Sequence, residues 1–113
     1  MIKRAEDRSD RFVKLFDRAL DKSALDGSKQ EDRLNERAKE LGRSMDDLRR
    51  EFDRKESYID TRPEMVHVLN VASGINQVII NRRVGPNAEQ SWSALRTELN
   101  ILASVYYLPR LRP

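Results

Sequence analysis

One pair of residues has the types and the spacing of metal ligands. Glu64 and His67 are three positions apart, so on a helix they share a face, as in each half of the di-iron site of some four-helix bundles. That site needs two such pairs and two further carboxylates, whereas His67 is the only histidine. A symmetric dimer would supply the second pair, but Glu64 follows Pro63 at a helix start, where the helix dipole alone favours a carboxylate. We therefore predict no metal and no cofactor, and interpret the pair as a helix-start glutamate and a partly buried histidine.

The sequence offers no other set of catalytic residues. It has no cysteine, which excludes thiol catalysis and thiolate metal sites. It has no Gly-x-Ser-x-Gly elbow, and a single histidine would have to serve any triad. The four glycines are scattered, so no glycine-rich loop can cradle a phosphate. We therefore assign no catalytic residue and predict that the protein is not an enzyme, with a metal-dependent enzyme as the alternative.

The arginines in the second half of the sequence are candidates for anion binding. Residues 61–113 carry six basic and three acidic side chains, whereas residues 1–60 carry sixteen of each. Guanidinium groups form forked hydrogen bonds with phosphate. Trp92, Tyr106 and Tyr107 could stack on bases, but Trp92 and Tyr106 fall on the apolar seam of a predicted helix and fit a core better. No nucleic-acid-binding module is recognisable, so binding of an anion or of nucleic acid is an alternative function. The candidate anion contacts are Arg82, Arg83, Arg96, Arg110 and Arg112.

The spacing of apolar residues predicts four helices that would position these side chains. The clearest is the second, in which apolar residues recur at steps of four and three: Leu34, Ala38, Leu41, Met45, Leu48 and Phe52. Gly27 and Ser28 mark the turn before it, and Pro109 ends the last helix. The predicted helices are about 3–25, 29–55, 62–82 and 87–107, followed by an extended, frayed tail, 108–113.

These segments predict an all-α protein. A chain of 113 residues fits one domain, and four amphipathic segments with short connections fit an antiparallel four-helix bundle. We therefore expect residues 1–113 to form a single bundle built from two helical hairpins. The net charge of +3 is too small to point to a polyanionic partner.

The third predicted helix is apolar on most sides. No residue from Met65 to Asn81 carries a fixed charge. Such a helix is either the most enclosed member of the bundle or an interface, because surplus exposed apolar area marks a binding surface. We predict a non-enzymatic helical binding or structural module that binds a protein partner or self-associates through this helix. The candidate interface residues are Val68, Val71, Ile75 and Val78.

Three runs of the sequence resemble a group of small, uncharacterised bacterial helical proteins: residues 6–12, 24–36 and 90–108. In that group a Trp-x-x-Leu-Arg-x-x-Leu-Asn-x-Leu-Ala-x-x-Tyr pattern closes the chain. It is matched here by Trp92, Leu95, Arg96, Leu99, Asn100, Leu102, Ala103 and Tyr106. The resemblance implies an all-helical fold and no activity. Its members often carry an export signal, which implies a cell-envelope, periplasmic or secreted location.

The printed sequence itself contains no recognisable targeting segment. The first ten residues, MIKRAEDRSD, lack the apolar core of a signal peptide. No run approaches the roughly eighteen apolar residues of a membrane-spanning helix. We therefore expect a soluble chain with no membrane span, in which Met1 is either the native start or stands where a leader was removed.

Overall fold

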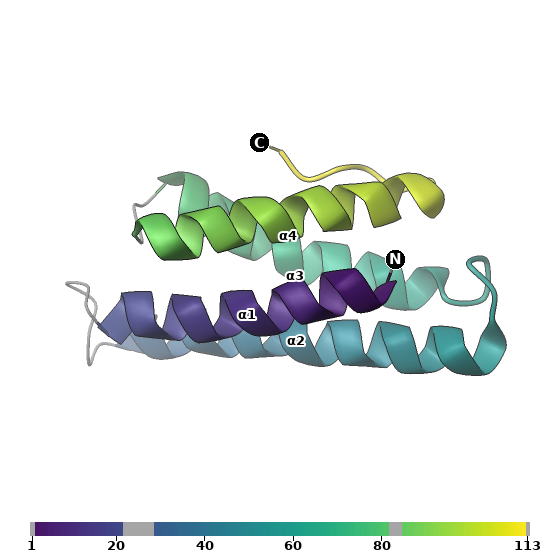
Figure 1. The fold of residues 1–113 in the computed structure, drawn as a ribbon, viewed down its shortest axis with the longest axis horizontal. Coiled ribbons are helices and arrows are strands. Elements are labelled where there is room, and N and C mark those ends of the chain that lie inside the picture. The colour runs from purple at the N-terminus through teal and green to yellow at the C-terminus, as the bar shows by residue number, and fades with distance from the viewer. Residues whose placement is uncertain (1, 22–28, 82–84, 113) are drawn as a thin grey trace.

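The computed structural model describes residues 2–21, 29–81 and 85–112, and these form four helices (Figure 1). The helices are α1, Ile2–Asp21; α2, Lys29–Lys55; α3, Arg62–Asn81; and α4, Pro86–Val105. No described residue lies in a strand, so the predicted all-α class is confirmed. The predicted caps at Gly27 and Ser28 lie outside the described residues.

The helices surround one core in the order α1, α2, α3, α4. Helix α1 packs on α2 and α4, and α3 packs on α2 and α4, as a four-helix bundle requires. Of the four helix pairs that pack together, α3 and α4 have the least extensive contact. The pairing into two helical hairpins therefore stays a prediction, and the seam between α3 and α4 needs another element to cover it.

Each helix contributes an apolar stripe to the core because its apolar residues recur at helical spacing. The largest buried side chain is that of Trp92, on α4. Its ring centroid lies 4.9 Å from that of Phe12, which in turn stacks on Phe16 at 5.1 Å. The aromatic contacts thus join α1 to α4, and the fully buried Met45 and Leu48 bring α2 into the same core.

Helix α4 ends in a turn that directs the chain back over the bundle. The Leu108 amide donates to the Ala103 carbonyl at 2.8 Å, and the Tyr107 amide donates to the Ser104 carbonyl at 3.2 Å. Tyr107 has a φ of 57°, the left-handed conformation common just after a helix. Beyond it, the C-terminal segment, residues 108–112, runs back beside α4 (Figure 1).

Helices α1 and α2 also meet through a pair of carboxylates. The hydrogen bond that Asp46 shares with Glu6, then desolvation, then the negative charges around it raise the pKa of Asp46 from 3.8 to about 6. Burial opposes ionisation of Glu6, but hydrogen bonds from Asp46 and Arg49 and the charges of Arg49 and Lys3 leave the pKa of Glu6 lowered. The Arg49 guanidinium donates to the Glu6 carboxylate at 2.6 Å. The raised pKa of Asp46 and the lowered pKa of Glu6 favour the arrangement in which a protonated Asp46 donates to an ionised Glu6.

We predict that Asp46→Asn stabilises the protein at pH 7. A raised pKa means that protonated Asp46 contributes stability below about pH 4, and that this contribution is lost as the pH rises through about 6. Asparagine keeps a donor for Glu6 and carries no charge, so the variant should have a higher melting temperature at pH 7. Its melting temperature should also change less with pH between pH 4 and 6. Circular dichroism melts at four pH values measure this, with Asp32→Asn, at an exposed position of α2, as the control. A lower melting temperature for Asp46→Asn at pH 7 would contradict the prediction.

Candidate binding site

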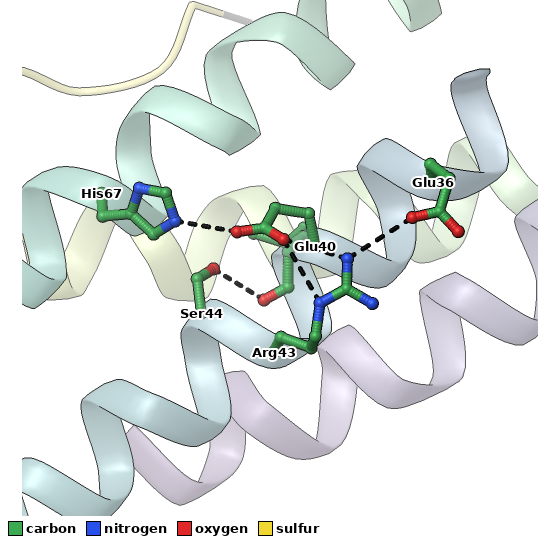
Figure 2. Close-up of polar contacts among 6 residues, drawn as sticks. Glu36, Glu40, Arg43, Ser44 and His67 are labelled. Carbon is green, nitrogen blue, oxygen red and sulfur yellow. Dashed lines mark hydrogen bonds and ion pairs between the residues drawn. The ribbon is translucent and has the colours of Figure 1, made fainter.

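The two residues with metal-ligand spacing, Glu64 and His67, have different surroundings in the structure. The His67 side chain is exposed, so the prediction that it is partly buried is wrong, and its Nε2 lies 3.0 Å from Oε1 of Glu40 on α2. Figure 2 shows Glu40 between His67 and Arg43, with Arg43 also reaching Glu36. Hydrogen bonds from His67 and then from Arg43 lower the pKa of Glu40. These residues form a solvated network in which two ion pairs of Arg43 lie within α2 and the contact between His67 and Glu40 links α2 to α3.

Glu64 takes no part in that network. It lies in the first turn of α3, as predicted, and its Oε2 is buried without a hydrogen-bond partner. Among the described residues, no group of three or more histidine, aspartate or glutamate side chains could hold a metal ion. His67 instead contacts Glu40 of α2 at the surface of the bundle.

The apolar residues of α3 point mostly into the bundle. Val68 and Ile75 are fully buried in the core, so their assignment to a partner interface is corrected. They are buried because α3 packs on both α2 and α4. Val71 and Val78 are half-buried and packed against the same core. The large apolar side chain that α3 does expose is Ile80, at 52%.

We predict that Val68→Glu unfolds the protein, whereas Ile80→Glu does not. A carboxylate at position 68 has no counter-ion in an apolar core and should cost about 3–5 kcal/mol, a large part of the stability of a small domain. A carboxylate at position 80 reaches solvent and should change stability by at most about 0.5 kcal/mol. Urea denaturation of both variants measures these differences. A folded Val68→Glu variant with lowered mass in light scattering would restore α3 as an interface.

The structure brings together two of the five candidate arginines. Arg82 and Arg83 lie outside the described residues, and Arg96 is half-buried on α4. Arg110 and Arg112 are exposed, and both line a pocket of about 590 Å³ between α3 and the C-terminal segment. We call this cavity the tail pocket. Its other lining residues are Ser73, Asn76, Gln77, Ile80, Asn81 and Leu111.

The C-terminal segment is fixed to the bundle by two asparagine side chains. Oδ1 of Asn100 accepts from the Leu111 amide at 2.7 Å, while its Nδ2 donates to the Leu111 carbonyl at 3.4 Å. Nδ2 of Asn76 donates to the Arg112 carbonyl at 2.8 Å. Leu111 is 8% exposed and belongs to the core. Residues 108–112 form no helix or strand, and these contacts hold the backbone of Leu111 and Arg112 against the bundle.

The position of Asn76 is set in turn by the core. Its Oδ1 accepts a hydrogen bond from Nε1 of the buried Trp92 at 2.8 Å, so both ends of the amide have partners. A hydrogen bond to a buried indole fixes the amide orientation, because the opposite orientation would leave two buried donors facing each other. Asn76 therefore presents its Nδ2 toward the C-terminal segment.

Among the residues that the structure describes, no acidic side chain lines the tail pocket. The sole acidic residue of α3, Glu64, lies in its first turn, far along the helix from Asn81. On α4, Glu98 forms ion pairs with Arg4 at 3.9 Å and with Arg8 at 3.5 Å, both on α1. Within the described part of the chain, the lining residues that carry a charge are Arg110 and Arg112, which gives the pocket positive electrostatic character.

Sequence reasoning missed the two asparagines that create this site. Asn76 follows Val68 and Ala72 at steps of four, which places a polar amide on the buried stripe of α3. A buried amide needs partners for both its donor and its acceptor, and this requirement was the available signal. Asn100 offered no comparable signal, because its partner is main-chain and lies eleven residues further along the chain.

We predict that Asn100→Ala exposes the C-terminal segment to trypsin. Loss of both hydrogen bonds to Leu111 frees the backbone after Arg110, and a protease needs an extended, unattached substrate. Cleavage after Arg110 should be at least tenfold faster than in the native chain, as measured by mass spectrometry over time. Asn87→Ala, at an exposed position near the start of α4, is the control. Equal cleavage rates for all three chains would show that Asn100 does not hold the segment.

Comparisons with protein-family models, with curated proteins and with solved structures found no match for this chain. The resemblance to small bacterial helical proteins therefore stays a prediction. None of the described helices combines the length and the apolar composition that a membrane crossing requires.

Proposed function

We propose that the protein is a non-enzymatic binding module that holds an anionic ligand in the tail pocket. The observation that carries this proposal is the described lining of the pocket, where two arginines occur with polar side chains and no described residue supplies an acid. The sequence offered anion binding by arginines as the alternative to self-association through the third helix, and we restrict it here to Arg110 and Arg112.

The chemistry of the lining fits a phosphate or carboxylate group. A guanidinium donates two parallel hydrogen bonds to such an oxyanion. The side-chain amides of Gln77 and Asn81 add neutral donors on the α3 side. A volume of about 590 Å³ lies within the range of small-molecule sites, which is about 300–1,000 Å³. The pocket thus suits a small anion or the anionic end of a larger ligand.

Self-association through α3 is the weaker proposal. Val68 and Ile75 are already packed in the core, so two of the four residues considered for that interface cannot contact a partner in the folded chain. The half-buried Val71 and Val78 leave little apolar area for association through this helix.

We predict that Arg110→Ala combined with Arg112→Ala abolishes anion binding. The probes are inorganic phosphate and a short oligonucleotide at low ionic strength, measured by calorimetry and by amide NMR shifts. The native chain should bind phosphate, with shifts confined to α3 and the C-terminal segment, and affinity should fall as salt rises. Arg50→Ala removes an arginine from α2 and should leave binding unchanged.

The two probes distinguish the sources of the anionic group. Tighter binding of the oligonucleotide, with a steep salt dependence, would identify nucleic acid as the ligand class. Binding of phosphate alone would identify a small anion. Absence of binding to both probes, or equal binding by the double variant, would overturn the proposed function.

A further inference from the structure

Three large apolar side chains are exposed at one end of the bundle: Tyr58, 39% exposed; Ile59, 85% exposed; and Tyr107, 91% exposed. We call this group of residues the end patch. Tyr58 and Ile59 belong to the connection between α2 and α3, and Tyr107 follows α4. Figure 1 shows that connection and the C-terminal end of α4 at the same end of the molecule.

The end patch stands on a fixed base. The ring of Tyr58 packs edge-on against that of Tyr106, with centroids 5.2 Å apart. The Tyr106 hydroxyl and the Thr61 hydroxyl oxygen are 2.7 Å apart, and Nε of Arg62 donates to the Tyr106 carbonyl at 3.2 Å. These contacts hold the α2–α3 connection against the end of α4, so the exposed rings lie on a preformed surface.

The end patch also contains the residue at which the C-terminal segment turns back. Tyr107 has a φ of 57°, a backbone conformation that residues with a Cβ adopt only at a cost in energy. Only five described residues follow it, and they can span about 17 Å when extended. A change in the backbone of Tyr107 would direct these residues away from the bundle and relieve its strain.

The groove that receives the segment recognises mainly its backbone. Asn76 and Asn100 bond main-chain atoms of Leu111 and Arg112, and Leu111 supplies the buried side chain. The groove therefore accepts residues 108–112 equally well from this chain or from a second copy. An identical segment is the one occupant whose fit is already established by these contacts.

We propose that two copies associate through their end patches and exchange their C-terminal segments. Each segment then fills the groove between α3 and α4 of the other copy and keeps its hydrogen bonds with Asn76 and Asn100, while the turn that joins Leu108 to Ala103 opens. The exchange relieves the backbone of Tyr107 and covers the exposed rings of the end patch, which offsets the entropy lost on association. The proposal stands on the end patch and the asparagines, and does not depend on anion binding.

The charges around the end patch suit a two-fold contact. Lys55, Glu56, Asp60 and Arg62 are all exposed there, two of each sign. In a two-fold interface the same surface meets itself, so a patch with balanced charges avoids the repulsion that a patch of one sign would create. The short reach of the segment also requires the two α4 ends to lie close together, as they do when end patches meet.

The test uses thiols, because the native chain has no cysteine. Nε of Arg110 donates to Oγ of Ser104 at 3.1 Å, so these exposed positions are neighbours in the closed chain. Chains carrying Ser104→Cys are mixed with chains carrying Arg110→Cys and treated with a short bifunctional thiol reagent. Exchange places the two thiols of different chains side by side, so the mixture should yield a cross-linked dimer of one chain of each kind. Melting curves confirm that both variants are folded.

Light scattering across a concentration series gives the mass independently. A dimer that cross-links far more efficiently in the mixture than in either variant alone supports the proposal. The proposal is overturned if the protein is a monomer at every concentration. It is also overturned if a dimer forms but the mixture of the two variants cross-links no more than either variant alone.

A second pair of variants tests the end patch. Ile59→Asp should weaken association at least tenfold, because it places a carboxylate at the centre of the contact, while the 85% exposure of Ile59 leaves the fold intact. Ile80→Asp changes an exposed isoleucine on α3 and should leave association unchanged. Equal effects of the two substitutions would place the contact elsewhere and overturn the proposal.

Discussion

The hydrogen bond from Trp92 to Asn76 is the interaction on which the C-terminal half of the structure depends. It satisfies the indole of the largest buried side chain, and it orients the amide that holds the Arg112 carbonyl. A buried donor left without a partner costs about 1–3 kcal/mol, so the core itself enforces this orientation. The C-terminal segment is thereby fixed along the seam where α3 and α4 approach least, and the tail pocket exists because the segment lies there.

The two halves of the chain use different physical chemistry. Helices α1 and α2 bury apolar stripes and cover the rest of their surface with ion pairs, such as that between Arg43 and Glu40. Surface pairs of this kind contribute about 0–1 kcal/mol each, so they govern solubility and orientation more than stability. Helices α3 and α4 have few charges and meet the C-terminal segment through neutral amides. An amide that bonds a backbone group is insensitive to salt, unlike the ion pairs of α1 and α2.

The sequence predicted the helices well because helical periodicity is a local property. The seam from Leu34 to Phe52 lies within α2, and its members from Leu34 to Leu48 are buried. The exposure of a residue depends on contacts with distant parts of the chain, which is why the predictions for Val68, Ile75 and His67 were wrong. The residue types at Val68 and Ile75 would be the same in an enclosed helix and in an exposed one. Only the packing of α3 on α2 and α4 shows that they belong to the core. His67 has a partner 27 residues away, which no spacing rule connects. The tail pocket likewise joins α3 to a segment about 30 residues further along the chain, through main-chain groups that carry no sequence signature.

The proposed tail exchange and the proposed ligand site share residues, and this sets how one would affect the other. The tail pocket of an exchanged pair consists of α3 from one copy and of Arg110 and Arg112 from the other, with the same lining as in a closed chain. A ligand with equal affinity for the two arrangements shifts nothing between them. It disfavours only the open chain, whose segment has left the groove and whose pocket has lost both arginines. An anion would therefore slow interconversion of closed and exchanged forms, since each conversion passes through the open chain, without changing which form predominates at equilibrium.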